Sequence, residues 1–476
     1  MLIAPTREQH EPLADDPPAP PTSARTGRLE MGVALAGFAA FCVLVLTKGS
    51  RLLEPDDYAY RASIVALSQG HLLLTTAQYE ALSRQLGGIA QWVQLPGGRW
   101  ISEKNPGYPF LAVAFQWLGA LRLAPLFYGG LGCAGLYAGG RRWLGRWGGT
   151  FAVLLFCTSG AAITFAWRAT MPTFTDASLV AAGAGALLWA MLAQEAPPRR
   201  RLAAGLAGFV ALEAATFVRY TDAVELAVAV VVLVALARPA RLPRRMVLWC
   251  LATVALFAAG VLVFDALVYG SPLKTGYGAG EITFGLSAVL PNLAHMPAPL
   301  VEAMPMVLPA LAALAWIAVR LAKQGGSWRH GEQWAARRLD GVVALSLVAG
   351  WAGIWGLYLA YTWTVNQGGA NAVHVIRFYL PALGLIALLG AWTLVRLPKV
   401  ASFGAAVVAL VLGVLSFHGL TAAGGLGPGL GPGRLPGGRP GVGRPPGFGG
   451  GIPGGIPGSG PPPEAGAGQG GTGGLP

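Results

Sequence analysis

The sequence is dominated by apolar runs that are long enough to cross a lipid bilayer. They recur from residue 31 to residue 420, and about 20 such residues in a helix span the roughly 30 Å hydrocarbon core. Only helices and closed barrels satisfy their own backbone hydrogen bonds in that layer. The mean hydropathy of +0.54 and the charged fraction of 12% agree with this. We therefore predict an all-α integral membrane protein and exclude a soluble catalytic domain.

Eleven of these runs qualify as candidate membrane spans. A further apolar stretch, residues 106–121, opens with two prolines and is only marginally long enough to cross. The eleven spans are residues 31–47, 123–140, 149–167, 177–193, 202–217, 222–237, 246–268, 300–320, 341–362, 377–396 and 400–420.

Basic residues predict the topology of these spans. Alternate connectors hold 17 lysines and arginines, whereas the connectors between them hold four. Because cytoplasmic loops carry an excess of Lys and Arg, the 17 cations indicate the cytoplasmic side. With a cytoplasmic N-terminus, residues 106–121 then do not cross, and we expect an interfacial or re-entrant helix that closes a large outer loop, residues 48–122. The same rule accounts for the net charge of +13 without nucleic acid.

The two ends of the chain differ from the membrane domain, residues 31–420. Residues 1–30 are Pro-rich and partly acidic, so we expect a disordered cytoplasmic N-terminus followed by an uncleaved anchor. The last 56 residues hold 24 Gly and 12 Pro, a composition that cannot bury enough apolar surface to fold. We therefore predict a disordered extracytoplasmic tail over residues 421–476.

Several common types of site have no support in the sequence. The four cysteines lie in apolar runs without a CxxC pair, and the six histidines are scattered, so neither a zinc site nor a disulfide framework is indicated. The sequence has no GxxxxGK[ST], GxSxG or HExxH motif in its required context. Gly135 and Gly139 form a GxxxG pattern that indicates close helix packing.

Ionisable residues gather at the outer ends of the predicted spans. A charge at the bilayer centre costs on the order of 3 kcal/mol, so charges are expected at the ends, but the outer ends should be poor in cations. Helix capping, snorkelling and a simple turn each explain single residues here, and a shared ligand site explains the set better. The candidates are Asp56, Asp57, Glu103, Lys104, Arg168, Asp176, Arg219, Asp222, Lys274, Tyr277, His374 and Arg377.

These segments, in this order, resemble the GT-C superfamily of polytopic glycosyltransferases over about residues 31–396. The nearest branch holds protein O-mannosyltransferases and bacterial lipid A aminoarabinose transferases. The resemblance rests on short motifs of this sequence. They are Asp56-Asp57 after the first span, Glu103-Lys104-Asn105-Pro106 before Gly-Tyr-Pro, the RRWLGRW turn, the stretch from Arg168 to Asp176, Arg219-Tyr220-Thr221-Asp222, Gly270-Ser271-Pro272-Leu273 and Arg377-Phe378-Tyr379-Leu380-Pro381.

The resemblance implies a GT-C-like bundle and an inverting transfer of sugar from a polyprenyl-phosphate donor to a cell-envelope glycan or lipid. The active site would face outward from the cell membrane, and Asp56 or Asp57, both expected in an aqueous loop, would be the base. Asp176 would orient the acceptor or assist, and Lys104, Arg219 and Arg377 would hold the donor phosphate. Substrate-binding roles fall to Glu103, Arg168, Asp222, Lys274, Tyr277 and His374.

Two departures from the family pattern bear on the acceptor. The acidic motif is Asp-Asp, whereas protein mannosyltransferases commonly have Asp-Glu, and no folded outer domain is predicted after the last span. Both argue against a protein acceptor. The predicted partners are the lipid-linked donor, the acceptor and membrane lipids. No cofactor follows from the motifs, and a divalent cation stays open.

Two other functions are compatible with a polytopic membrane protein. A transporter or lipid flippase for an anionic or lipid-linked substrate also uses intramembrane charges and broken helices. It predicts ionisable residues in mid-span and two related halves, whereas the clearest polar groups here lie at outer ends. A silent scaffold that displays the Gly/Pro tail is the third alternative.

Overall fold

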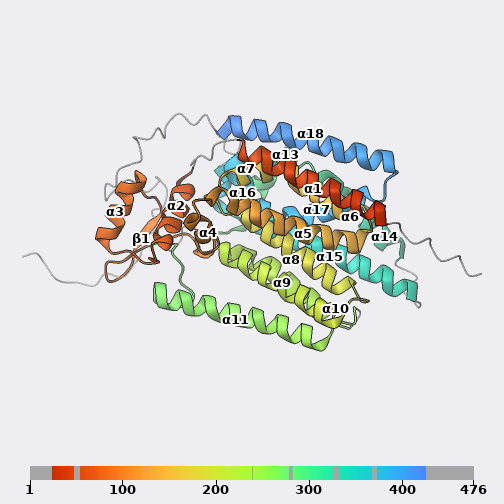
Figure 1. The fold of residues 1–476 in the computed structure, drawn as a ribbon, viewed down its shortest axis with the longest axis horizontal. Coiled ribbons are helices and arrows are strands. Elements are labelled where there is room, and N and C mark those ends of the chain that lie inside the picture. Colours follow the sequence, from red (N-terminus) through yellow and green to blue (C-terminus); the bar gives the residue numbers. More distant parts are fainter. Residues whose placement is uncertain are drawn as a thin grey trace, which may run out of the picture. The chain divides into compact units, whose positions relative to one another are not determined.

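The computed structural model describes residues 24–47, 54–238, 240–277, 282–324, 332–366 and 372–424. Within these ranges, side chains are not described for residues 24–27, 320–324, 332–339, 366, 372–374 and 421–424. Apart from one hairpin and isolated bridges, the regular structure described is helical, which confirms the predicted fold class. Figure 1 shows these helices side by side as a bundle.

The first part of the chain supplies the N-terminal helix and the segment predicted as a large loop. Helix α4 has 11 residues, about 16 Å of helix, which is too short to cross a roughly 30 Å core. This length agrees with the prediction that residues 106–121 do not span. The elements are α1 (Ala24–Leu46), α2 (Pro55–Ser68), α3 (Thr76–Leu86), β1 (Trp92–Gln94), β2 (Trp100–Ser102), α4 (Gly107–Trp117) and η1 (Leu121–Leu123).

The remaining elements are long helices interrupted by short ones. They are α5 (Ala124–Leu144), α6 (Gly148–Cys157), α7 (Gly160–Trp167), α8 (Thr173–Leu192), α9 (Pro198–Val218), η2 (Tyr220–Asp222), α10 (Ala223–Leu236), α11 (Arg244–Tyr269), η3 (Leu286–Ala288), α12 (Val289–His295), α13 (Pro297–Ala303), α14 (Val307–Gln324), α15 (Glu332–Leu359), η4 (Thr362–Asn366), α16 (Ala372–Tyr379), η6 (Leu380–Ala382), α17 (Leu383–Leu394) and α18 (Lys399–Gly424).

All eleven predicted spans coincide with helical segments. Among the described residues, seven helices are long and apolar enough to cross a membrane, or up to nine if each of two bent pairs counts as one span. Helix α10 falls short because it has 14 residues. Helix α5 has 21 residues but carries six glycines, which reduce its hydropathy. The multi-pass character is thus supported, and the predicted number of eleven exceeds this count.

Two predicted spans are bent rather than straight. Helices α6 and α7 meet at 58°, and the Ser159 hydroxyl caps α7 by accepting a hydrogen bond from the Ala162 amide at 3.3 Å. Helices α13 and α14 meet at 111° around a segment that contains Pro305, which cannot donate a backbone hydrogen bond. Breaks of this kind leave polar backbone groups that side chains can satisfy.

The GxxxG pattern packs α5 directly against α8. A Cβ added to Gly135 would lie 2.7 Å from the Ala182 Cα, and one added to Gly139 would lie 2.5 Å from the Gly185 carbonyl oxygen. Any side chain at these positions would therefore separate the two backbones. Small residues allow this contact in membrane helices, so the structure agrees with the predicted packing role of the pattern.

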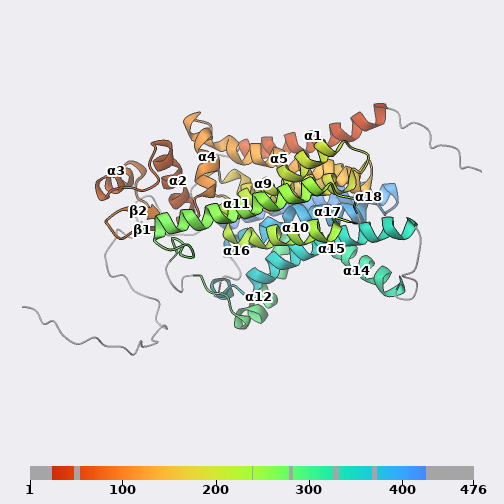
Figure 2. The same ribbon diagram turned by 90° about the horizontal axis from the view of Figure 1, so that it is seen from below.

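The first loop folds into a small cap beside the long helices (Figures 1 and 2). Strands β1 and β2 pair antiparallel, with Val93 opposite Ile101. Tyr79 of α3 stacks on Trp100 of β2 with ring centroids 4.2 Å apart. Helix α2 packs on α4. The cap thus fixes the start of α2 and the segment that follows β2, both of which enter the site.

The chain ends differ slightly from the predicted domain limits. Helix α1 begins at Ala24, so residues 24–30 belong to the first helix rather than to the disordered terminal segment. Helix α18 continues to Gly424, four residues into the predicted tail. The rest of the predicted tail and residues 1–23 lie outside the described residues.

Arginines from the predicted cytoplasmic connectors bind helix ends opposite the first-loop cap. Arg142 donates to the Leu192 carbonyl at the end of α8 at 2.9 and 2.8 Å. Arg201 donates to the Ala190 carbonyl at 2.9 Å. Cations favour helix C-termini, where backbone carbonyls lack partners. One end of the bundle is thus occupied by structural arginines, which leaves the opposite end for the candidate site.

Candidate functional site

Several helices begin or end at the same end of the bundle, and each presents a predicted site residue there. Helix α2 begins at Pro55, α8 begins at Thr173 and α9 ends at Val218. The polar segments next to these ends hold the candidates, because a long apolar helix excludes charges from its middle. Motifs that are far apart in the sequence therefore lie close together where these helix ends meet.

Arg168 and Asp57 form a buried ion pair behind the site. The Arg168 side chain is 2% exposed and that of Asp57 is 0% exposed, and Arg168 Nη2 bonds to Asp57 Oδ2. Thr170 Oγ1 donates to Asp57 Oδ1 at 3.1 Å, and the Glu54 amide donates to Asp57 Oδ2 at 3.0 Å. Both carboxylate oxygens of Asp57 are thus occupied, so Asp57 anchors the start of α2.

Asp56 has a different environment, although it is the neighbouring residue. Its Oδ1 lies 3.2 Å from Lys104 Nζ and its Oδ2 lies 2.9 Å from Arg377 Nη1. Lys104 Nζ also lies 3.2 Å from Glu103 Oε1. Arg377 in turn bonds to Glu54. Asp56 therefore lies between two cations that come from distant parts of the sequence.

Arg219 and Asp176 form a second pair beside the first. Arg219 Nε lies 3.4 Å from Asp176 Oδ2, and Arg219 Nη1 donates to the Arg377 carbonyl at 3.1 Å. Asp176 is fully buried, and Asp222 is buried beside it. The Asp176 carboxylate thus fixes the Arg219 guanidinium, and the Arg219–Arg377 contact joins the two pairs.

A cavity of about 610 Å³ opens in front of these pairs. This volume falls in the range of about 300–1,000 Å³ that is typical of small-molecule sites. Asp56, Glu103, Lys104, Arg219 and Arg377 line it together with Gln91, Asn105 and Thr221. Its aromatic lining residues are Tyr60, Tyr220, Tyr277, Phe284, Tyr358, Tyr361, Trp363 and Phe378.

Aromatic rings lie against the cations of the cavity. Lys104 Nζ is 5.0 Å from the centroid of the Tyr277 ring. The Arg377 guanidinium is 4.8 Å from the Phe378 ring and 5.8 Å from the Trp363 ring. Rings at this range attract a cation through their negative faces. The walls therefore restrict the cations while leaving them at the cavity surface.

The surrounding charges keep Asp56 ionised and Lys104 protonated. Burial alone would raise the pKa of Asp56, but Arg377 and Lys104 outweigh it and lower that pKa below its ordinary value. Burial likewise opposes the charge of Lys104, yet Tyr277, Asp56 and Glu103 raise the pKa of its ammonium group. The cavity thus combines a carboxylate with a permanent cation in contact.

The structure separates the predicted site residues into three groups. Asp56, Glu103, Lys104, Arg219, Tyr277 and Arg377 line the cavity. Asp57, Arg168, Asp176 and Asp222 are buried outside its lining, which corrects the expectation that Asp57 lies in an aqueous loop. Lys274 is exposed outside the lining. His374 belongs to α16, but its side chain lies outside the described residues.

Sequence reasoning missed Glu54 and most of the aromatic lining. Glu54 directly precedes the acidic motif, yet it is 5% exposed and contacts both Arg168 and Arg377. Its position directly before Pro55 was the available signal. Proline is common at the first position of a helix, and the residue before it is then the N-cap. Tyr358 comes from the apolar helix α15, where nothing in the sequence marks it as polar lining.

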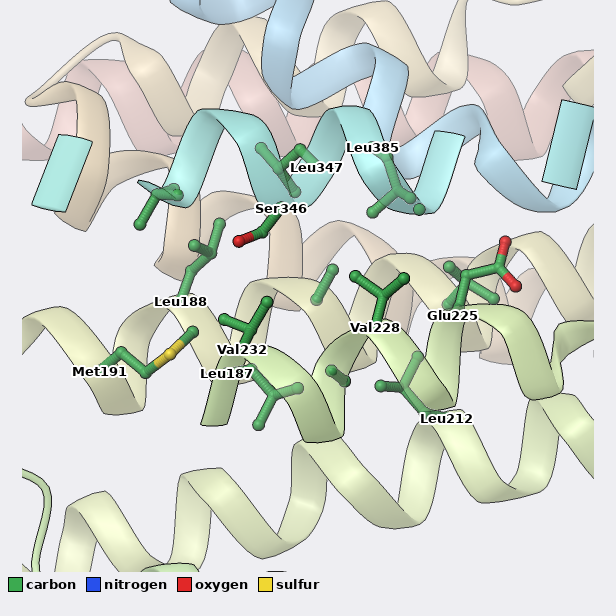
Figure 3. Close-up of a pocket in the computed structure, with 15 residues that line it drawn as sticks. Leu187, Leu188, Met191, Leu212, Glu225, Val228, Val232, Ser346, Leu347 and Leu385 are labelled. Carbon is green, nitrogen blue, oxygen red and sulfur yellow. The ribbon is translucent and has the colours of Figure 1, made fainter. Parts of the chain in front are cut away.

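A second, smaller cavity lies among the long helices and has different chemistry (Figure 3). Its volume is about 60 Å³, and its walls come from α8, α9, α10, α15 and α17. Aliphatic side chains such as Leu187, Val232 and Leu347 line most of it, and Glu225 is the ionisable residue in the lining. A cavity of this kind offers no cation for a phosphate, so the charged cavity is the better candidate site.

The described residues contain no group of three or more His, Cys, Asp or Glu side chains that could hold a metal ion. In the cavity wall, the Lys104 ammonium group lies between Asp56 and Glu103.

The chain was compared with known proteins and solved structures. No protein-family model and no curated protein sequence matches it. Crystal structures of ArnT from Cupriavidus metallidurans match with 16% identity over 81% of this chain in the apo state (TM-score 0.46) and over 84% when bound to undecaprenyl phosphate (TM-score 0.44). The archaeal oligosaccharyltransferase AglB from Archaeoglobus fulgidus, in complex with an inhibitory peptide and a dolichol-phosphate, matches with 10% identity over 85% (TM-score 0.47).

These matches are partial and distant. The chain spans 63% and 65% of the two ArnT chains and 56% of the AglB chain. All three TM-scores are below 0.5, so the function has to be decided by the residues of the site.

Proposed function

We propose that this chain is an inverting glycosyltransferase that uses a polyprenyl-phosphate sugar and acts on a cell-envelope glycan or lipid. One observation supports the proposal most. Asp56 lies at the wall of a cavity of about 610 Å³ between Lys104 and Arg377, at 3.2 and 2.9 Å. A general base beside cations that can hold a leaving phosphate is the arrangement that inverting transfer requires.

The proposed step uses these groups in defined roles. The acceptor hydroxyl oxygen attacks the anomeric carbon of the sugar from the face opposite the phosphate, and Asp56 takes the hydroxyl proton. The bond between the anomeric carbon and the phosphate oxygen breaks with its electron pair. The leaving polyprenyl phosphate gains negative charge, which Lys104, Arg377 and Arg219 stabilise in the cavity wall.

The buried acids act through other residues in this proposal. Asp176 holds Arg219, with Oδ2 3.4 Å from Nε, and is therefore a positioning residue rather than an acceptor-binding one. The Asp57–Arg168 pair fixes the start of α2 and with it the position of Asp56. Neither Asp57 nor Arg168 lines the cavity, so neither is proposed to touch substrate.

The resting contacts of Asp56 link donor binding to its basicity. The cations that we assign to the donor phosphate are the same cations that hold Asp56 and lower its pKa. A bound phosphate competes for Lys104 and Arg377, which weakens their pull on the carboxylate. Asp56 then becomes a stronger base only after the donor has arrived.

Positive-inside topology supports an outward-facing site in the cell membrane. The 17 cations of the predicted cytoplasmic connectors include the arginines that bind helix ends opposite the cavity. The lipid-linked donor would then enter from the outer leaflet.

Reconstitution in liposomes tests the proposal. The purified chain would be incubated with the polyprenyl-phosphate sugar pool and the envelope glycans of its host, and new glycosidic bonds and free polyprenyl phosphate would be measured. We expect both products from the wild type and from Glu80→Gln, an exposed acid of α3, and about 100-fold less of each, or lower, from Asp56→Asn. Movement of a lipid-linked substrate across the vesicle without bond formation would decide for a flippase.

A further inference from the structure

Glu54 connects two arginines that are far apart in the sequence. Its Oε1 lies 2.8 Å from Arg168 Nη1, and its Oε2 bonds to Arg377 Nη1. The Glu54 side chain is 6% exposed, so water screens these contacts weakly. A buried carboxylate with one arginine on each oxygen is fully used as an ion-pair partner, which argues against a role as base.

Arg377 is shared between two carboxylates. The same nitrogen, Nη1, contacts Glu54 Oε2 and lies 2.9 Å from Asp56 Oδ2. An acid that shares a cation with a second acid gains less net stabilisation of its charge than it would gain alone, because the two acids also repel each other. The negative charge of Glu54 therefore offsets part of the positive charge that Arg377 directs at Asp56.

We infer that Glu54 is a positioning residue. It holds the Arg377 guanidinium beside Asp56 and offsets part of the positive charge that this guanidinium directs at Asp56. This inference rests on the proposed function, because it gives Asp56 the role of base. Glu54 touches neither the cavity nor a reacting atom. Its effect reaches Asp56 through Arg377 and through direct repulsion between the two carboxylates, and it keeps Asp56 more basic than two unshared cations would.

The charges around Asp56 determine what a change at Glu54 does. Arg377 and Lys104 lower the pKa of Asp56, and Glu54 raises it. Removing the Glu54 charge therefore lowers the pKa of Asp56 further. The titratable and charged groups that interact with Asp56 are Glu54 and Tyr60 of the α2 segment, Lys104 after β2, Tyr277 after α11, Tyr361 after α15 and Arg377 of α16. Glu103 and Arg219 line the same cavity.

Neutralising Glu54 leaves each arginine with one acid. Arg168 keeps Asp57, and Arg377 keeps Asp56. The buried arginines are therefore not left uncompensated, which is the usual cause of large destabilisation. Gln has nearly the same shape as Glu, so Glu54→Gln is expected to fold and to isolate the effect of the charge.

The test compares wild type, Glu54→Gln and Glu54→Asp by two measurements. The first is turnover in the liposome assay. The second is labelling of Asp56 by a carbodiimide, which reacts with protonated carboxyls, followed across pH by mass spectrometry. We expect Glu54→Gln to lower turnover at least 10-fold and to shift half-labelling of Asp56 to lower pH by about half a unit or more.

Glu54→Asp is the matched control for charge. It keeps the charge but is one methylene shorter, so it cannot reach both arginines. We expect reduced turnover with half-labelling of Asp56 near the wild-type pH. An unchanged half-labelling pH in Glu54→Gln would overturn the inference. If Glu54→Gln cannot be produced, wild-type turnover in Glu54→Asp would overturn it. If the wild type transfers no sugar, the proposed function fails, whereas the labelling still decides the role of Glu54.

Discussion

At the scale of single residues, the site shows how two adjacent acids acquire opposite environments. Successive residues of a helix point about 100° apart, so Asp57 faces the buried Arg168 while Asp56 faces the cavity. The sequence predicted that the acidic motif lies near the site. It could not predict which acid is buried, because the partner arginine is 111 positions away.

Substitution of the two acids should separate their roles. Asp56→Asn should lose about 100-fold or more in turnover, the contribution of a positioned base. Its thermal midpoint should fall less than that of Asp57→Asn, because Lys104 keeps Glu103 and Arg377 keeps Glu54. Asp57→Asn should instead lower the thermal midpoint, because breaking a buried ion pair costs about 3–5 kcal/mol. Turnover per folded molecule and thermal unfolding of the purified variants measure this. Equal thermal and kinetic effects at both positions would contradict the assignment.

The pH dependence should differ between the free enzyme and the complex. Asp56 must be ionised to act, so activity falls as the pH falls through its pKa. In the free enzyme, Arg377 and Lys104 hold that pKa below its ordinary value, so kcat/KM should persist to a lower pH than kcat. The donor phosphate occupies the cations in the complex and raises the pKa. Profiles of both constants for the donor measure this, and coincident acidic limbs would exclude competition for the cations.

The cations should contribute through charge. Lys104→Arg should keep part of the activity, whereas Lys104→Gln should weaken donor use, because only the former retains a cation. Arg377→Gln should behave like Lys104→Gln, and the double variant should be less than additive since both share one phosphate. Donor KM and kcat in the liposome assay measure these effects. Arg84→Gln, on the exposed α3 pair, is the control, and normal specific activity with reduced yield of Lys104→Gln would indicate a snorkelling anchor.

At the scale of elements, the hydrophobic pattern predicted the positions of the long helices but not their bends. Each predicted span contains helix, because an apolar run in a bilayer has few alternatives. The bend at Ser159 and the reversal near Pro305 depend on neighbouring helices, which periodicity does not reveal. Helix α4 is short, as expected from the prolines at its start and from its short apolar run.

The α5–α8 contact should be sensitive to a single methyl group. Gly139→Ala places a Cβ 2.5 Å from the Gly185 carbonyl oxygen, so the helices must separate and we expect a lower thermal midpoint. Gly260→Ala, in α11, meets nothing within 4 Å and should leave the midpoint unchanged or slightly higher. Thermal unfolding of both variants in one detergent measures the difference. Equal midpoints would show that α5 and α8 pack less closely than described.

At the scale of the whole molecule, the two sets of charges have separate tasks. Arginines such as Arg142 and Arg201 bind helix C-termini, whereas Lys104, Arg219 and Arg377 face a cavity with carboxylates. The count of cations along the sequence predicted this division, because topology depends on loop charge. The packing of aromatic rings around the cavity was not predictable, since residues such as Tyr358 come from apolar helices.

Cysteine labelling from the two sides of the membrane should separate the same two ends. In a background without Cys42, Cys133, Cys157 and Cys250, a membrane-impermeant reagent applied outside should modify Glu80→Cys but not Arg141→Cys. A cysteine in residues 421–476 should also react from outside. Permeabilised cells supply the control for Arg141→Cys. Outside labelling of Arg141→Cys in intact cells would reverse the predicted orientation and with it the side on which the proposed reaction occurs.

The partners of the ion pairs lie far apart in the sequence, and this separation determines when during synthesis the site can form. Glu54 meets Arg168 across 114 positions and Arg377 across 323. At about 5–20 residues per second, the ribosome needs roughly 10–40 s to make the stretch between the two arginines. During that time Asp56 lacks Arg377, and Glu54 lacks one of its two arginines. In the proposed reaction, the unfinished protein is therefore inactive until α16 has been made and folded, when Arg377 completes both the ion pairs and the cavity wall.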